Sequence, residues 1–371
     1  MAAQRDRRRL VSQDSSRGHL LLRADANGGT GGIGHVMRCL GLAQAWQARG
    51  GKATFVSNCE GDILPRRVES SGVGFIPLPR ANQDPADLFA VIGSLSGNGR
   101  GPGDPWIVLD GYHFGPEYQR AIRQAGYRLL VIDDNAHQPE YHADILLNPC
   151  IHAGQLSYRC DPDTMLLLGT RYLLLRPEFL SWREWHRDIP DGARRVLVTM
   201  GGADPNNVTM KVLRALDHVR VPGFQAKVLV GPANRYVDIV RQAAQRSAQD
   251  VEVLTPEGDM PGLMAWADVG VSASGITAWE TAFMGLPTIL ITLADNQELI
   301  GAELHRQGLA ACLGWWEQVD EEMIAGLLVR LLEDPGLRRD MSRQSRVLVD
   351  GLGTDRVAAI LEGSFVQGAY R

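Results

Sequence analysis

Two series of short apolar runs, each run followed by a helical pattern, constrain the fold of this chain more than any other feature. The runs cover residues 19–22, 52–57, 73–78, 106–110, 128–133 and 145–148 in the first series, and residues 195–200, 227–230, 251–254, 269–272 and 288–292 in the second. Strands that alternate with helices form parallel sheets covered by helices. The sequence therefore predicts an α/β protein with two domains in tandem. Ligands of open α/β sheets bind beyond the carboxyl ends of the strands, so we expect a shared cleft.

Breaks in this alternation predict the domain boundaries. Residues 1–17 are rich in arginine and lack apolar periodicity, so we expect a mobile tail, with nucleic-acid binding as the less favoured interpretation. We expect a first domain over residues 18–175, a connection with packed tryptophans over 176–193, and a second domain over 194–371. Helices after Glu321 and over 354–365 are expected to cap the second domain, and the last helix is a candidate to return to the first. The Gly- and Pro-rich interval 93–105 predicts a surface loop.

The composition excludes several classes of protein. The chain has 371 residues and a formal net charge of −5, whereas general nucleic-acid and membrane-surface binders usually carry a basic excess. No apolar stretch approaches the roughly 20 residues that span a bilayer, and the N-terminus lacks a secretory apolar core, so we expect a cytoplasmic protein without a membrane span. The scattered cysteines favour free buried thiols over a disulfide framework or a zinc site. They are Cys39, Cys59, Cys150, Cys160 and Cys312.

A glycine-rich turn between the first strand and the first helix carries the strongest local signal. The sequence there is Arg23-Ala24-Asp25, followed by Gly28-Gly29-Thr30-Gly31-Gly32-Ile33-Gly34-His35. Backbone N–H groups in such a turn face an anion at a helix N-terminus, where the helix dipole also favours negative charge. The same positive end disfavours protonation of His35, so we expect a neutral imidazole that accepts a proton. The alternative is an ordinary turn whose histidine bonds its neighbours. The spacing departs from G-x-G-x-x-G, which argues against an NAD site.

Three turns in the second half also suit a ligand. Met200-Gly201-Gly202-Ala203-Asp204 allows close approach of a diphosphate or sugar. The turn that begins at Ser272 places hydroxyls before a helix and Glu280 two helical turns later, which suits phosphate and ribose, or is an ordinary serine cap. Asn296 and Gln297 suit sugar hydroxyls, or merely begin a helix. The pair Asp133-Asp134 follows a strand without further ligands at metal spacing, which favours an ordinary strand end over a metal site.

Taken together and in this order, the motifs resemble the hydrolases of pseudaminic acid biosynthesis, which remove UDP from UDP-2,4-diacetamido-2,4,6-trideoxy-β-L-altropyranose. The matching pieces are Arg23 to Asp25, Gly32 to His35 with Arg38, Asp110 and Tyr112, Ile132 to Asp134, Asp144 to Asn148, Leu174 to Phe179, Met200 to Asp204, Ser272 to Glu280, and Asn296 with Gln297. The second half, including Ala265 to Asp268 and Gly285 to Pro287, also resembles the nucleotide-binding domain of the glycosyltransferase that completes the bacterial cell-wall lipid precursor. The resemblance implies a GT-B fold, in which two Rossmann-like domains with parallel sheets face a central cleft and the C-terminal domain holds UDP.

The resemblance also implies a reaction and its residues. It implies hydrolysis at the anomeric carbon with inversion, with His35, Tyr112 and Asn296 as the catalytic residues. His35 is the implied general base, and Tyr112 and Asn296 lie at the sugar. It implies Glu280 at the ribose, the Met260 backbone at uracil, and Gln297 near the diphosphate and hexose. The other implied substrate-binding residues are Arg23, Asp25, Gly32, Gly34, Arg38, Asp110, Gly201, Gly202, Gly231, Ser274, Gly275 and Thr277. The implied partner is a small-molecule UDP-sugar, with no metal and no cofactor, and with a monomer or weak homo-oligomer. The glycine loop is one residue longer than the family's usual form, which leaves the sugar stereochemistry open.

Two other functions remain open at this point. A glycosyltransferase would use an acceptor hydroxyl in place of water, and a membrane-bound acceptor would need an amphipathic patch. The segment from Leu88 to Leu95 is a modest candidate for such a patch. A sugar-nucleotide-binding regulator would bind without turnover, and the histidine at the helix entrance argues against it.

Overall fold

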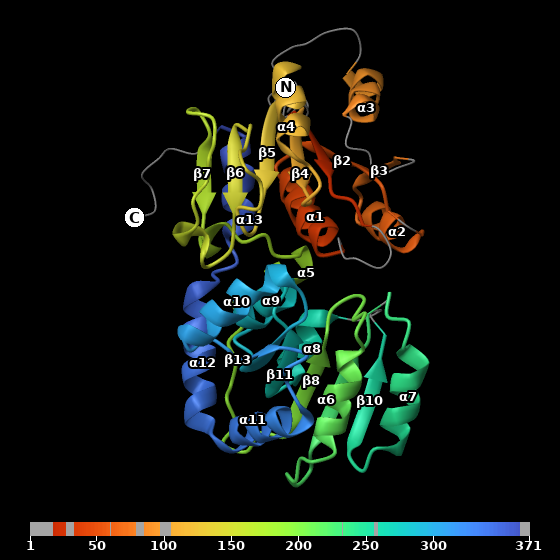
Figure 1. Cartoon of the computed structure of the whole chain (residues 1–371), viewed down its shortest axis with the longest axis vertical. Helices are drawn as coiled ribbons and strands as arrows, with labels where there is room; N and C mark the ends of the chain where they lie inside the picture. The colour runs from red at the N-terminus through yellow and green to blue at the C-terminus, as the bar shows by residue number, and fades with distance from the viewer. Residues whose placement is uncertain are drawn as a thin grey trace, which may run out of the picture.

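Two α/β domains stack along the long axis of the molecule (Figure 1). The computed structural model describes residues 18–26, 33–59, 61–78, 85–96, 105–231, 233–255 and 259–363. The predicted tail over residues 1–17 and the glycines of the turn at residues 28–32 lie outside the described residues.

The described part of the first domain is built on a seven-stranded sheet in the order β3-β2-β1-β4-β5-β6-β7, with all neighbouring strands parallel. The strands are β1 (His19–Arg23), β2 (Lys52–Ser57), β3 (Gly74–Pro77), β4 (Trp106–Asp110), β5 (Arg128–Ile132), β6 (Ile145–Asn148) and β7 (Met165–Leu168). The helices are α1 (Ile33–Ala48), α2 (Ile63–Ser70), α3 (Ala86–Ser96) and α4 (Pro116–Gln124), with short 3₁₀ turns η2 (Ala153–Gln155) and η3 (Thr170–Tyr172).

The second domain is built on a six-stranded parallel sheet, in the order β10-β9-β8-β11-β12-β13 among the described residues. Its strands are β8 (Arg195–Thr199), β9 (Gln225–Leu229), β10 (Asp250–Leu254), β11 (Val269–Ala273), β12 (Thr288–Thr292) and β13 (Ala311–Trp315). The helices after the first sheet are α5 (Pro177–Leu180), α6 (Val208–Leu216), α7 (Val237–Arg246), α8 (Met260–Trp266), α9 (Ile276–Phe283), α10 (Asp295–Arg306), α11 (Glu321–Glu333), α12 (Pro335–Leu348) and α13 (Gly353–Leu361).

Every predicted strand is present, but the sequence analysis missed one edge strand in each sheet. The missed strand β7 is short, and its Met165 and Leu166 are exposed, so it lacks the buried pattern of an inner strand. The missed strand β13 contains Gly314 at φ 90°, and its pairing with β12 shifts in register. One loop prediction was wrong at its start, because residues 93–96 form the last turn of α3; residues 97–104 lie outside the described residues.

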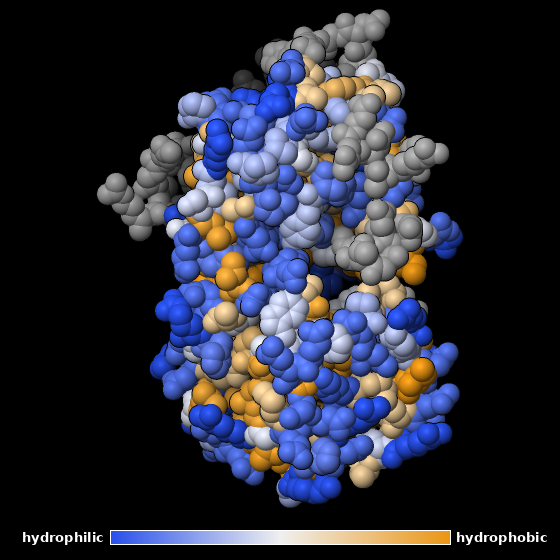
Figure 2. All heavy atoms as spheres, in the orientation of Figure 1, coloured by the Kyte–Doolittle hydropathy of each residue, from blue (hydrophilic) through white to orange (hydrophobic). Residues whose placement is uncertain are grey.

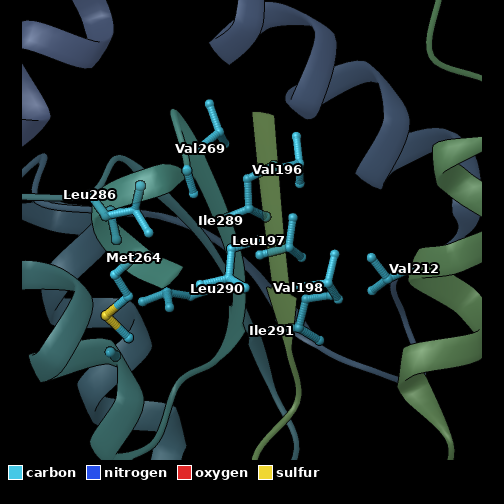
Figure 3. Close-up of a cluster of buried hydrophobic side chains, with 14 of the residues drawn as sticks. Val196, Leu197, Val198, Val212, Met264, Val269, Leu286, Ile289, Leu290 and Ile291 are labelled. Carbon is cyan, nitrogen blue, oxygen red and sulfur yellow. The ribbon is translucent and has the colours of Figure 1, made fainter. Parts of the chain in front are cut away.

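The core of the second domain lies on both faces of its sheet. Val196, Leu197 and Val198 are consecutive on β8, and all are buried (Figure 3). Successive side chains of a strand point to opposite faces, so a continuous apolar run requires cover on both sides. Helices supply that cover, with Val212 of α6 and Met264 of α8 in the same buried cluster. Full burial of each such side chain contributes roughly 1.5–3 kcal/mol.

The chain passes between the domains twice. The first passage leads through α5, and the second precedes α13, which packs against α1 (Figure 1). Val357 and Leu361 of α13 belong to the same buried cluster as the apolar residues of β1. The Trp106 Nε1 group donates a hydrogen bond to the Leu361 carbonyl oxygen at 2.9 Å. The last helix therefore completes the core of the first domain.

None of the described helices is both long enough and apolar enough to cross a membrane. Leu88 and Ile92 of α3 are buried in the first domain, and Phe89 and Val91 are partly buried against the same cluster, so these side chains of the segment considered as an amphipathic patch pack on the domain. The face seen in Figure 2 is mainly hydrophilic, with apolar side chains in small separate groups.

Strand order determines where a ligand site can form in each domain. In the first sheet the order reverses at β1 and β4, and in the second it reverses at β8 and β11. The loops that follow such neighbouring strands diverge to opposite faces, which opens a crevice at the carboxyl ends of the strands. The segment after β1 leads to His35, and the segment after β4 leads to Tyr112. The corresponding loops of the second domain contain Gly201 after β8 and Gly275 after β11.

Candidate active site

A cavity of about 420 Å³ lies between the two domains. The first domain contributes Gly34, His35, Arg38, Asp134, Pro149 and Cys150 to its lining, and the first interdomain passage contributes Leu173 to Arg176. The second domain contributes Met200 to Pro205, Gly231, Met260, Gly275 to Thr277, Glu280, Asn296 and Gln297, with several apolar neighbours. Residues predicted from separate motifs therefore meet in one cavity.

His35 is the third residue of α1 and lies at the edge of this cavity. Its Nδ1 atom lies 2.6 Å from Oδ1 of Asp110, the last residue of β4. A carboxylate only accepts hydrogen bonds, so Nδ1 carries a proton in this contact, and in the tautomer with a single ring proton Nε2 is the acceptor. The His35 side chain is 14% exposed, whereas that of Asp110 is fully buried. This is the arrangement of a general base held in one tautomer by a buried carboxylate.

Arg38 links Asp110 to a second carboxylate one turn into α1. Its Nε donates to Asp110 Oδ2 at 2.6 Å, and its Nη1 donates to Asp134 Oδ1 at 2.7 Å. Burial alone would raise the pKa of Asp110, but the charges of Arg38 and His35 lower it well below its usual range. Asp110 therefore stays ionised. The hydrogen-bond partners of Asp110 are protein groups. Asp110 therefore orients His35 and Arg38, a role that differs from the predicted contact with substrate.

Tyr112 does not itself line the cavity, but it connects the two domains through Asp134 and Asn296, which do. Its hydroxyl lies 3.2 Å from Asp134 Oδ2 as donor and accepts from Asn296 Nδ2 of α10 at 2.8 Å. The His35 and Tyr112 rings meet edge to face, with centroids 5.2 Å apart. Burial, followed by the charge of Asp134, raises the pKa of Tyr112 above its ordinary value, so the hydroxyl stays protonated. The structure thus brings together the three residues that the resemblance implied as catalytic.

A second histidine, which the sequence analysis did not single out, supports Tyr112 from the other side. The His137 ring packs edge to face on the Tyr112 ring, its Nδ1 lies 2.5 Å from Asp133 Oδ2, and its Nε2 lies 3.2 Å from the Tyr112 carbonyl oxygen. Burial would lower the pKa of His137, but the hydrogen bond and charge of Asp133 outweigh it and raise the pKa. The spacing of Asp133 and His137, four residues apart beyond a strand end, was the available signal.

Glycines around the cavity allow close contacts between the two domains and within the second domain. A Cβ atom at Gly34 would lie 2.6 Å from Cδ1 of Ile276, at the start of α9, and one at Gly202 would lie 2.8 Å from Cδ1 of Ile33. A Cβ at Gly231 would lie against the Gly202 carbonyl oxygen. These glycines therefore permit close packing, in addition to lining the cavity.

The helices α9 and α10 of the second domain begin at the cavity. Gly275 precedes α9, and Thr277 lies in its first turn; Asn296 and Gln297 lie in the first turn of α10. The Gln297 side chain accepts from the Leu293 backbone N–H at 3.0 Å and lies against Gly275. Helix N-termini present unpaired N–H groups and the positive end of the helix dipole. This end of the cavity is suited to a diphosphate.

Glu280 lines the cavity within α9 and is 2% exposed. Arg176 of the interdomain passage binds it through two hydrogen bonds, from Nε to Oε1 at 2.6 Å and from Nη2 to Oε2 at 2.9 Å. Met260 begins α8 and also lines the cavity, after Asp259 caps the helix by accepting from the Gly262 N–H group at 3.0 Å.

Several predicted binding residues lie elsewhere. Arg23 is fully buried, lies over the rings of Phe114 and Tyr118, and has Nη2 3.3 Å from Asp25 Oδ2. Asp25 also pairs with His113 Nε2 at 2.9 Å. Neither residue belongs to the lining of the cavity that the described residues form. Ser274 is fully buried against Gly301. Gly32 lies outside the described residues.

The described cysteines are free, and two of them border the carboxylate network. Cys39 Sγ lies 3.5 Å from Asp110, and Cys150 Sγ lies 3.6 Å from Asp134. Burial raises the pKa of both thiols, so they remain protonated and unreactive. Within the described ranges no group of three or more His, Cys, Asp or Glu side chains is arranged to hold a metal ion.

Comparison with known proteins identifies the family. Residues 195–350 match the model of the glycosyltransferase family 28 C-terminal domain. The spore coat polysaccharide biosynthesis protein SpsG of Bacillus subtilis is 32% identical over 243 residues, which cover 65% of this chain and 70% of that protein. The chain belongs to the SpsG family.

Two further relatives of this SpsG-family chain are enzymes. The UDP-N-acetylglucosamine--N-acetylmuramyl-(pentapeptide) pyrophosphoryl-undecaprenol N-acetylglucosamine transferase of Halorhodospira halophila is 28% identical over 376 residues, covering 91% of this chain and 97% of that enzyme. The pseudaminic acid cytidylyltransferase and UDP-2,4-diacetamido-2,4,6-trideoxy-β-L-altropyranose hydrolase of Helicobacter pylori is 19% identical over 211 residues, covering 56% of this chain and 37% of that protein.

The fold is confirmed by a solved structure. MurG from Acinetobacter baumannii superposes with a TM-score of 0.63 at 16% sequence identity, covering 93% of this chain and 99% of that one. The expected GT-B fold, with two parallel-sheet domains facing a cleft, is therefore correct. This SpsG-family chain is a member of the GT-B glycosyltransferase superfamily.

Proposed function

We propose that this SpsG-family protein hydrolyses a UDP-linked 2,4-diacetamido-2,4,6-trideoxyhexose at its anomeric carbon. The products would be UDP and the free sugar with inverted configuration. The observation that carries the proposal is the His35–Asp110 pair, 2.6 Å apart, at a cavity that both domains line. The opposite side of this cavity contains the first turns of α9 and α10, which suit a diphosphate leaving group.

The proposed binding mode assigns each part of the substrate to one part of the cavity. The diphosphate would lie at the first turns of α9 and α10, and the ribose hydroxyls would bind Glu280. The uracil would meet the backbone at Met260. The sugar would lie toward the first domain, between His35 and Asn296. The relatives named for UDP-sugar reactions support a UDP-sugar as the substrate.

In the proposed reaction, water attacks the anomeric carbon from the face opposite UDP. His35 Nε2 takes a proton from the water as the new C–O bond forms, and the bond between the anomeric carbon and the diphosphate oxygen breaks with its electron pair leaving on UDP. Asp110 stabilises the imidazolium that forms. Backbone N–H groups at α9 and α10 stabilise charge on the departing diphosphate. The imidazolium then returns its proton to solvent.

A glycosyltransferase is the second candidate, favoured by one observation. The similarity to the cell-wall N-acetylglucosamine transferase of Halorhodospira halophila extends over 91% of this chain. In that case an acceptor hydroxyl would occupy the position of the water, and His35 would deprotonate it. The two reactions share a donor site and differ in the nucleophile.

Acceptor-free turnover distinguishes the candidates. The purified protein would be incubated with a panel of UDP-linked diacetamido-trideoxyhexoses and UDP-N-acetylglucosamine, with EDTA and without any acceptor. Mass spectrometry would follow the products, and proton NMR would report the first anomer formed. We expect UDP and an inverted free sugar from one diacetamido substrate. Tight binding of the panel without UDP release would contradict hydrolysis and leave the transferase, which stalls without acceptor, or the sugar-nucleotide-binding regulator. Release only after added Mg²⁺ would contradict the metal-free mechanism.

A further inference from the structure

The segment from Leu174 to Phe179, singled out in the sequence, has no role in the mechanism above. Its arginine, Arg176, nevertheless contacts Glu280, the residue proposed to bind the ribose. We propose that Arg176 is a positioning residue that orients Glu280 toward both ribose hydroxyls of a nucleoside diphosphate. Through Arg176, this ribose recognition also depends on the position of α1. This inference rests on the proposed function for the assignment of Glu280 to the ribose.

The geometry of the pair leaves room for a ligand. Arg176 Nε and Nη2 bind separate oxygens of Glu280, at 2.6 and 2.9 Å. A carboxylate has about four acceptor positions, so each oxygen keeps one for a further donor. Because a two-point guanidinium contact fixes the carboxylate plane, the remaining positions have a defined direction. Both residues line the cavity. Two vicinal hydroxyls of a ribose match two neighbouring acceptors.

Arg176 also supplies the positive charge that this buried carboxylate needs. Burial raises the pKa of Glu280, and the charge of Arg176 opposes that shift. Glu178 adds a negative charge nearby but is itself bound by Arg176 Nη1 at 3.1 Å and by Arg67 at 3.2 Å. Two other arginines near α9 bind backbone carbonyls instead. Arg346 of α12 binds the Phe283 carbonyl oxygen, and Arg187 binds that of Met284.

The backbone that carries Arg176 is fixed against the helix that carries His35. A Cβ atom at Gly41 of α1 would lie closer than 3.0 Å to the Leu175 carbonyl oxygen, and 3.8 Å from the Cα atom of Arg176. The absence of a side chain at Gly41 therefore lets α1 rest directly on this segment. A shift of α1 relative to the second domain would therefore displace Arg176 from Glu280, which α9 carries. Ribose recognition and the position of His35 are mechanically connected.

The test compares binding of UDP and 2′-deoxy-UDP by calorimetry between pH 6 and pH 8.5. The variants are Arg176→Met, Arg176→Lys and, as a matched control, Arg67→Met, whose side chain is half exposed and pairs with the outer Glu178. Hydrogen bonds to charged groups contribute enough for roughly a tenfold to hundredfold preference for the ribonucleotide. We expect the wild type and Arg67→Met to keep this preference across the range.

In Arg176→Met the preference for UDP over 2′-deoxy-UDP should fall at least about tenfold at pH 6. Part of this preference should return toward pH 8.5 as Glu280 ionises. The preference of Arg176→Lys should lie between those of the wild type and Arg176→Met, because the lysine charge keeps Glu280 ionised without fixing the plane of its carboxylate. A merely structural role would lower the affinity for both nucleotides equally. An unchanged preference in Arg176→Met overturns the inference and leaves the proposed function intact. If Arg176→Met fails to fold, Arg176→Lys decides: a reduced preference supports the inference, and a wild-type preference overturns it. A wild type that binds both nucleotides equally removes the Glu280 assignment itself.

Discussion

His35 obtains its proposed chemistry from a partner that lies far away in sequence. The glycine turn and the start of a helix predicted where the histidine lies, and the helix dipole predicted a neutral ring. Asp110, 75 residues later, could not be paired with it from motif spacing, because the pairing depends on β1 and β4 being neighbours in the sheet. Asp110 holds the ring through Nδ1 and would stabilise the charge that forms when Nε2 takes a proton.

Replacement of this histidine should separate binding from turnover. We expect His35→Ala to reduce kcat by about 10² to 10⁴, the usual contribution of a positioned general base, with UDP affinity within about threefold of wild type. The fold should persist because Asp110 Oδ1 keeps a hydrogen bond from Arg38 Nη2 at 2.7 Å. Steady-state kinetics and calorimetry check both values. The control is His186→Ala, an exposed histidine of the connection, which should turn over normally. Near-normal turnover by His35→Ala would remove the histidine from the mechanism.

The histidine beside Tyr112 makes a pH-dependent contribution to stability. The pKa of His137 is raised above its unfolded value of about 6.5. A group of this kind stabilises the fold fully below its unfolded pKa, and the stabilisation is lost as pH rises through the folded pKa. We therefore expect the difference in unfolding free energy between wild type and His137→Gln to be largest near pH 5.5 and to shrink toward pH 9. Urea titrations at several pH values measure it. A difference that grows with pH would mean that His137 is held neutral.

At the scale of elements, α1 is confined on several sides. It packs against the sheet, against α13 and against the first interdomain passage. This explains why buried residues occur around much of the helix, from Val36 and Cys39 to Leu42, instead of along one stripe. A sequence pattern can indicate such an all-round apolar helix, but the identity of the elements that cover it depends on the return of α13 and on the domain contact.

Gly41 should be needed in α1 despite the poor helix propensity of glycine. Alanine there would place a Cβ atom against the Leu175 carbonyl oxygen, which belongs to backbone and cannot rotate away. We expect Gly41→Ala to lower the free energy of unfolding by about 1–3 kcal/mol, as overpacking does. The control is Gly326→Ala in α11, where nothing lies within 4 Å and alanine should gain about 0.5–1 kcal/mol. Equal effects of the two changes, measured by urea denaturation, would contradict the close contact.

Element prediction succeeded where the apolar pattern was strong and failed where tertiary context decides. The inner strands β4, β6 and β12 were predicted with their observed ends, because continuous apolar runs are typical of buried parallel strands. The edge strands β7 and β13 were missed, since an edge strand is buried on fewer sides and carries a weaker pattern. The cavity residues of the second domain were found from turns after strands, whereas the Arg176–Glu280 pair needed the path of the chain between domains.

At the scale of the whole molecule, the last helix belongs in space to the first domain. Leu361 of α13 is 2% exposed and lies in the buried cluster built around β1 and α1. Arg49 of the segment after α1 pairs with Glu362 at 2.8 Å beside it. The C-terminal part of the sequence therefore stabilises the domain that carries His35, and the two passages of the chain lie in contact where Gly353 meets Leu173.

Truncation of that side chain should weaken the first domain. We expect Leu361→Ala to cost about 2–5 kcal/mol of unfolding free energy, the range for deleting a buried leucine side chain. Ile239→Ala on α7 is the control, because Ile239 is 53% exposed and should change stability by less than about 0.5 kcal/mol. Urea unfolding followed by circular dichroism checks both values. A cost for Leu361→Ala no larger than that of the control would mean that α13 does not contribute to the core.

The most direct test of the proposed site is to identify which bond of the substrate breaks. The reaction would be run in H₂¹⁸O without acceptor, using the diacetamido substrate that gives UDP, and quenched within one turnover for mass spectrometry. Attack of water on the anomeric carbon, with His35 as base, predicts ¹⁸O in the free sugar and none in UDP, with the rate reduced about 10² to 10⁴ in His35→Ala. Label in UDP would place the attack on phosphorus and contradict the account.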